Sequence, residues 1–206
     1  MEKKVILVLN KVNFPRAEDY KHYDHRTHVY LKPDTYIGSD ERVEREVWIY
    51  NFDSKKMVKK NIDFVPGCER IYLEILTNAA DNVGRSRRAN IDPGPIEITM
   101  NKSTISIKNY GLPIPREKHS EQKIYIPQMI FGTLLTSSNY DVDRHEAGTN
   151  GIGAKATNIF SIEFSVEIHD HIRKLKYRQS WYDNMTRRTE PVIEQYNGKI
   201  SSVQVT

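Results

Sequence analysis

The sequence is poor in cysteine and in long apolar runs. Cys68 is the one cysteine among 206 residues, which excludes an internal disulfide and a multi-cysteine zinc site. We therefore expect a reducing compartment, cytosol or nucleus. No apolar run approaches the roughly 20 residues of a membrane-spanning helix, so no membrane partner is expected. The N-terminus lacks a small-residue cleavage site, which argues against a signal peptide. Internal repeats and low-complexity segments are also missing.

The net charge of the chain does little to distinguish between possible functions. The chain has 31 Lys and Arg against 27 Asp and Glu, a net charge of +4. This balance is compatible with nucleic acid or nucleotide phosphates, but most basic domains of this size have no such partner. Arg85, Arg87 and Arg88 form a basic run that is interpreted as a solvated helix end or, alternatively, as a DNA contact.

The first half of the chain predicts an arm, a hairpin and a long helix. Residues 1–30 show no clear periodicity and are expected to form an arm with at most one short strand. Pro33 and Gly38 predict a loop. Alternation over 46–52 and 57–65 predicts a hairpin, and Trp48 is expected in the core, as is Trp181 later in the chain.

A helix over 69–88 is predicted because apolar residues recur at helical spacing. These are Ile71, Ile75, Leu76, Ala79, Ala80 and Val83. The remaining expectations are a hairpin over 96–101 and 104–109, a loop over 110–122, helices over 126–138 and 154–160, and an antiparallel meander from 162. This order predicts an α+β fold, a two-layer sandwich with a mostly antiparallel sheet and helices on one face.

Three polar residues on the long helix form a stripe beside its apolar face. Glu74, Asn78 and Asn82 are spaced by four residues and share one side of the helix. Polar groups next to a buried face need partners or a ligand. A structural helix edge is one interpretation. The other is a nucleotide site, where the carboxylate activates a water and an amide oxygen ligates Mg²⁺.

A glycine-rich segment, residues 148–155, precedes the second short helix. Its glycines allow close approach to a ligand, and the helix N-terminus and Lys155 favour phosphate. The pattern is neither the Walker sequence nor GxGxxG, and many such segments are plain turns. Combined with the Glu74 stripe, the segment points to a phosphate ligand.

Several strings together resemble the GHKL ATPases. They are EILTNAADN (74–82), SIKNYGLPIP (106–115), IYIPQMIFGTLLTSSNYD (124–141) and GTNGIGAKATNIFS (148–161). YLKPDTYIGS (30–39), VPG (65–67) and LLTSSNY (134–140) are similar to the eukaryotic-type topoisomerase II branch, which includes viral relatives. The resemblance implies the GHKL (Bergerat) fold over residues 31–206, with 1–30 as a strap exchanged between protomers.

The resemblance also implies roles for individual residues. Glu74 would be the general base, and Asn78 the protein ligand of Mg²⁺. Asn82 would contact phosphate, and Asn109 would read the adenine edge, with Ile114 and Ile130 as pocket walls. The remaining ATP contacts would be Ser137, Ser138, Asn139, Gly148, Asn150, Gly151, Ile152, Gly153, Ala154 and Lys155.

The chain departs from the family pattern at four positions. Tyr110 and Pro113 replace the usual acidic residue and second glycine after Asn109, and Pro113 restricts the backbone there. Ile168 stands where a threonine helps to hold adenine. Thr149 replaces a basic residue. These departures concern the adenine pocket and the lid, and leave Glu74 and Asn78 in place.

The function implied is an ATP-dependent gate of a type IIA DNA topoisomerase, a homodimer that closes on ATP to capture double-stranded DNA. That role implies the nucleus, or a viral factory or virion for a viral relative. The transducer lysine, TOPRIM metal site and cleavage tyrosine have no counterpart here, so we expect slow hydrolysis and no DNA cleavage. Alternatives are a nucleotide-dependent clamp of the chaperone or mismatch-repair type and, less well supported, a histidine kinase.

Overall fold

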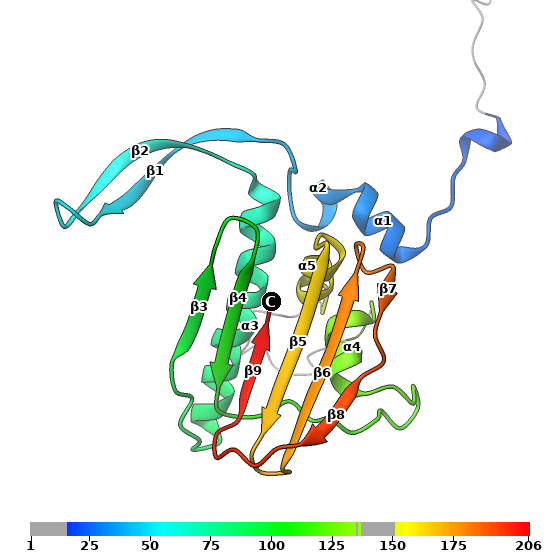
Figure 1. The fold of residues 1–206 in the computed structure, drawn as a ribbon. Coiled ribbons are helices and arrows are strands. Elements are labelled where there is room, and N and C mark those ends of the chain that lie inside the picture. The colour runs from blue at the N-terminus through cyan, green and yellow to red at the C-terminus, as the bar shows by residue number, and fades with distance from the viewer. Residues whose placement is uncertain (1–15, 135, 137–150) are drawn as a thin grey trace, which may run out of the picture.

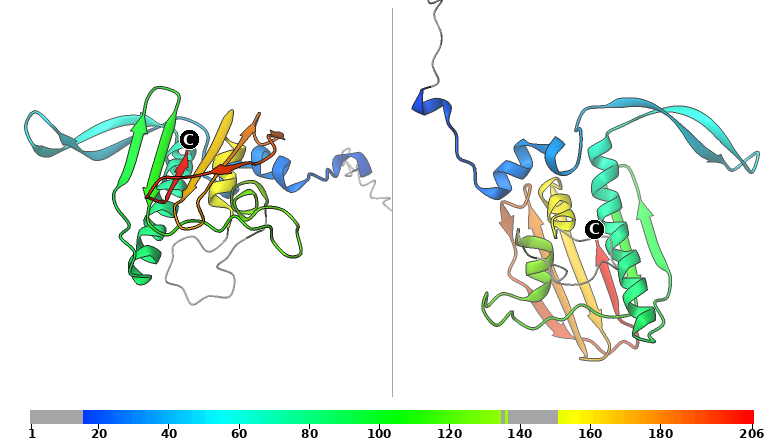
Figure 2. Two further views of the ribbon diagram at one scale, coloured as in Figure 1. Left: turned by 60° about the horizontal axis from the view of Figure 1, so that its bottom comes forward. Right: turned by 180° about the vertical axis from the view of Figure 1, so that it is seen from behind.

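A computed structural model describes residues 16–134, 136 and 151–206. In this part of the chain, three helices cover one face of an antiparallel sheet (Figures 1 and 2), which confirms the expected two-layer α+β fold. The helices are α3 (Pro66–Arg88), α4 (Ile126–Gly132) and α5 (Gly153–Ile159). The strands are β3 (Ile96–Met100), β4 (Ile105–Tyr110), β5 (Glu163–Asp170), β6 (Leu175–Tyr182), β7 (Arg187–Arg188), β8 (Val192–Gln195) and β9 (Ser202–Val205).

The sheet differs from the expected meander at its last strand. Its order is β3-β4-β9-β5-β6-β7, with β8 also paired to β6. β9 lies between β4 and β5, where Val203 pairs with Asn109 on one side and with Ile168 on the other. The alternation of β9 marked it as a strand, but alternation carries no information about which strands become its neighbours. The insertion of β9 joins the two halves of the sheet.

The core lies between the sheet and the helices. On β5, Phe164, Val166 and Ile168 alternate with more exposed residues and are buried. They pack with Trp181 of β6 and with Ile75 of α3 in one cluster. The interior position predicted for Trp181 is confirmed, since its exposed fraction is 1%.

The long helix α3 begins three residues before its expected start. Pro66 occupies its first turn, where a missing N–H costs nothing. The next residue, Gly67, donates its backbone N–H to the Ser39 carbonyl at 2.8 Å. A Cβ at Gly67 would press on Ile37 and on that carbonyl. Glycine therefore allows the helix to start close against the preceding segment.

The first hairpin stands away from the sandwich. β1 (Val43–Asn51) and β2 (Lys56–Phe64) form their own two-stranded sheet, which projects from the body in Figure 1. The prediction that Trp48 lies in the core is wrong, because 61% of its surface is exposed. An alternating strand has the same pattern whether or not a second layer covers it, so the sequence could not reveal the difference.

The N-terminal arm contains helix where at most a strand was expected. Asp24 caps α1 (His25–Leu31) by accepting a hydrogen bond from the Thr27 backbone N–H at 3.1 Å. The short helix α2 (Pro33–Tyr36) follows in the predicted loop. α1 contacts the body of its own chain, where the Tyr30 ring stacks on Phe160 with centroids 5.8 Å apart. Among the described helices, none is long and apolar enough to span a membrane.

Candidate functional site

The polar stripe of α3 meets the start of α5. Glu74 is half-buried and forms an ion pair with Arg70, one turn earlier, at 2.7 Å. Gly153, the first residue of α5, lies so close to Glu74 that a Cβ there would collide with Glu74 Oε2. The structure thus brings together the acid of the stripe and the end of the glycine-rich segment, 79 residues apart in sequence. Asn78 is also half-buried, one turn further along α3.

The next residue of the stripe ties α3 to the end of β4. Asn82 is buried, and its Nδ2 donates to the Tyr110 carbonyl at 3.1 Å. Asn109, buried on β4, directs its own Nδ2 to the same carbonyl over a longer 3.5 Å. Both amide nitrogens therefore converge on one backbone oxygen. The expected contact of Asn82 with phosphate stays a prediction.

Gly111 and Ser86 fix the turn after β4. Gly111 has φ +94°, and a Cβ there would collide with the Ser86 side chain. Ser86 is fully buried, donates its Oγ–H to the Asn82 carbonyl at 2.7 Å and accepts from the Leu112 N–H at 2.9 Å. Sequence reasoning missed Ser86, although it continues the four-residue spacing of the Glu74 stripe.

The residues expected around an adenine pocket lie in different surroundings. The Tyr110 hydroxyl donates to Glu97 at 2.8 Å, at the exposed surface. Pro113 is buried. Ile168 is entirely buried on the helix-covered face of β5. Ile114 and Ile130 are partly buried and pack against the core cluster.

Lys155, the cation expected to favour phosphate, lies inside the protein. Its side chain is buried, and Nζ donates to the carbonyls of Thr136 and Gly151. Burial disfavours the charged ammonium and lowers the pKa of Lys155 to about 8. These contacts connect the residues on either side of segment 137–150.

Part of the expected site lies outside the described residues. Ser137, Ser138, Asn139, Gly148, Thr149 and Asn150 all belong to this group. Of the described members of the glycine-rich segment, Gly151 has φ +61°, Ile152 precedes the first turn of α5, and Ala154 is buried. Within the described ranges, no group of three His, Cys, Asp or Glu side chains is arranged for a metal.

No protein-family profile matches the chain. The DNA topoisomerase 2 of Plasmodium falciparum is 46% identical over 187 residues, which cover 88% of this chain and 13% of that protein. This chain therefore spans about one eighth of the length of that relative.

Solved structures of topoisomerase II are also similar to this chain. The ATPase region of Saccharomyces cerevisiae topoisomerase II is 42% identical, with a TM-score of 0.87 over 92% of this chain and 50% of that one. The ATPase domain of Thermus thermophilus gyrase B is 18% identical with a TM-score of 0.58, which shows a shared fold. The chain belongs to the eukaryotic DNA topoisomerase II family and has the fold of its GHKL ATPase domain.

Proposed function

We propose that this chain binds ATP with Mg²⁺ and hydrolyses it, as the nucleotide-operated gate of a type II DNA topoisomerase. The observation that carries the proposal is the contact between Glu74 on α3 and Gly153 at the start of α5. A carboxylate is held there against a helix start that follows a glycine-rich segment. Such helix starts favour phosphate because their first N–H groups lack partners within the helix.

Glu74 is the general base in this proposal. A carboxylate next to the terminal phosphate orients a water and accepts its proton. Its ion pair with Arg70 does not prevent this role, because Arg70 is 59% exposed and exposed ion pairs are weak. Asn78 supplies an oxygen ligand for Mg²⁺, of the hard type that this ion prefers. Bound Mg²⁺ would neutralise charge on the phosphates.

The base end of the nucleotide lies at the end of β4. Asn109 reads the adenine edge, and Ile114 and Ile130 provide apolar walls. Asn82 and Ser86 support this end by fixing the turn at Gly111. The remaining ribose and phosphate contacts are assigned to Asn82, Ser137, Ser138, Asn139, Gly148, Asn150, Gly151, Ile152, Gly153, Ala154 and Lys155.

A second copy of the chain is the proposed partner, with double-stranded DNA held between the subunits. The β1–β2 hairpin, which projects from the body (Figure 1), supports dimerisation. Its side chains Trp48, Tyr50 and Phe52 are exposed. Aromatic side chains are enriched in protein interfaces. A duplex held by its backbone needs positive potential and no sequence-specific contacts. The nucleus is the corresponding location.

Glu74→Gln tests the proposal. Glutamine keeps the size of the side chain but cannot accept the proton, so ATP should still bind while hydrolysis falls at least ~10²-fold. Binding is measured by calorimetry and turnover by phosphate release. Wild-type binding without any turnover would favour the nucleotide-dependent clamp. Unchanged turnover in the variant would exclude Glu74 as the base.

A further inference from the structure

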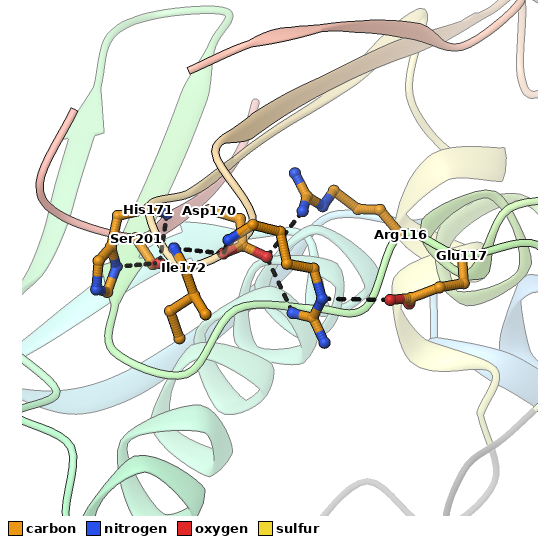
Figure 3. Close-up of polar contacts among 7 residues, drawn as sticks. Arg116, Glu117, Asp170, His171, Ile172 and Ser201 are labelled. Atoms are coloured by element: carbon orange, nitrogen blue, oxygen red, sulfur yellow. Dashed lines mark hydrogen bonds and ion pairs between the residues drawn. The ribbon is translucent and has the colours of Figure 1, made fainter. Parts of the chain in front are cut away.

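An ion pair lies buried beside the base end of the proposed site. Arg116 belongs to the segment between β4 and α4, and Asp170 ends β5. Arg116 Nη2 and Asp170 Oδ2 are 2.8 Å apart, and the two side chains are 2% and 0% exposed. Figure 3 shows Asp170 as the centre of a polar cluster that includes Glu117 and Ser201. No part of the ATPase reaction proposed above uses this pair.

Asp170 is fully supplied with hydrogen-bond donors. Its Oδ1 accepts from the backbone N–H groups of Ile172 and Arg173 at 2.9 and 3.0 Å, and Arg173 Nη1 donates to Oδ2 at 3.0 Å. Burial by itself would raise the pKa of Asp170, but these bonds and the charge of Arg116 outweigh it, so the pKa is lowered. The carboxylate therefore remains charged inside the protein.

Arg116 has fewer hydrogen-bond partners than Asp170. Nε and Nη1 are buried and have no hydrogen-bond partner among the described residues. Donors left unsatisfied in the interior are costly, and an apolar pair of similar size is often at least as stable as a buried ion pair. Fold stability is therefore a poor explanation for the pair. What the pair does provide is a buried, directional connection between two segments, which are also joined by the exposed ion pair between Arg173 and Glu117.

Those two segments carry Ile114, a proposed wall of the base end, and Ile168 of the core cluster against which Ile114 packs. Arg116 follows the pocket-wall residue Ile114 by two positions, and both are more buried than Pro115 between them. Asp170 follows Ile168 by two positions on the same buried face of β5. Ile114 packs against the cluster that contains Ile168. The ion pair therefore joins the two segments two residues further along the chain than Ile114 and Ile168.

We propose that Arg116 is a positioning residue for nucleotide binding: through Asp170 it holds the Ile114 wall at a fixed place relative to β5. The proposal rests on the ATP-binding function proposed above. It predicts that loss of the connection weakens recognition of the base and leaves recognition of the phosphates intact. General damage to the fold would weaken both.

The test uses the double variant Arg116→Met/Asp170→Asn. Asparagine keeps the oxygen that caps the Ile172 N–H, and Arg173, which loses Asp170, keeps its ion pair with Glu117, so the melting temperature should stay close to that of the wild type. Arg116→Met alone would leave the buried Asp170 carboxylate with only the more exposed Arg173 as its cationic partner, and this variant is expected to melt earlier. Glu117→Gln is the matched control, because it breaks only the exposed ion pair with Arg173 in the same cluster.

Dissociation constants of Mg·ATP and of inorganic tripolyphosphate are measured by calorimetry for each protein. For the double variant we expect ATP to bind about 10-fold more weakly, the usual scale of coupling between contacting groups, with tripolyphosphate unchanged. The control should equal the wild type. Wild-type ATP affinity in the double variant, or equal loss for both ligands, would overturn the positioning role. A wild-type chain that binds neither ligand would overturn the ATP-binding function itself.

Discussion

Gly153→Ala tests directly whether the carboxylate of Glu74 must occupy its observed place. A Cβ at Gly153 would overlap Glu74 Oε2 and lie 2.6 Å from Cδ and 3.0 Å from Cγ. The backbone at Gly153 has no positive φ, since it begins α5, so alanine introduces no backbone strain there. Among the described residues, the atoms nearest to this Cβ all belong to the Glu74 side chain, which must therefore move.

The expected effect is therefore large on catalysis and small on stability. Rotating a half-exposed, flexible side chain costs about 0.5–1.5 kcal/mol at most, and alanine in a helix offsets up to about 1 kcal/mol of this relative to glycine. A catalytic group displaced by roughly 1 Å loses on the order of 10²-fold in rate. We expect turnover to fall by about that factor, with a nearly unchanged melting temperature.

Turnover is measured by phosphate release at saturating ATP, and stability by thermal unfolding of the same samples. Gly84→Ala is the matched control, because Gly84 also lies in a helix and its added Cβ would meet only Arg88 Nη1, at 3.4 Å. That variant should keep its turnover and gain about 1 kcal/mol of stability. Wild-type turnover in Gly153→Ala would refute the argument that Glu74 acts from this position.

Three further predictions concern stability. Ser86→Ala removes the two hydrogen bonds of the buried Ser86 hydroxyl and should lower the free energy of unfolding, measured in urea, by about 1–3 kcal/mol. A loss below about 0.5 kcal/mol, typical of surface positions, would contradict the role of Ser86 in the turn. Trp181→Ala should lower the free energy of unfolding by about 3–5 kcal/mol, whereas Trp48→Ala should lower it by less than about 0.5 kcal/mol. Urea unfolding measures both values, and equal losses would contradict the exposed position of the hairpin. The pKa of Lys155 is lowered to about 8, so between pH 8 and its ordinary value of 10.5 the unfolded chain binds the extra proton, and stability rises with pH. The free energy of unfolding relative to Lys155→Met should therefore increase by up to about 1.4 kcal/mol per pH unit in that window, and a flat difference would contradict the burial of the ammonium.

Local patterns predicted most elements of this fold. The helix over 69–88 was confirmed with an earlier start, because its apolar spacing is long and regular and only residues 66–68 of the first turn lay outside it. Both expected hairpins are present, since each has alternating strands around a short polar turn. The resemblance to the GHKL ATPases identified the family correctly, because its strings keep their order and spacing through most of the chain.

Each wrong or missed prediction has a physical cause. Trp48 and Trp181 lie in strands of similar pattern, yet only Trp181 has a helical layer above it. α1 was missed because its seven residues are too few for a clear period, and the side-chain cap by Asp24 and packing against Phe160 contribute to its stability. Ser86 was passed over because its partners, the Asn82 carbonyl and the Leu112 N–H, are backbone groups that no sequence pattern displays.

The sequence by itself determined the long helix, the two hairpins, the polar stripe of α3 and the family, because these depend on spacing along one chain. Tertiary structure alone decided that β9 enters between β4 and β5, that Gly153 lies against Glu74, and that Arg116 meets Asp170 in the interior. Each of these is a contact between distant segments. Such contacts are set by how the layers pack and by which polar groups must find partners once water is excluded.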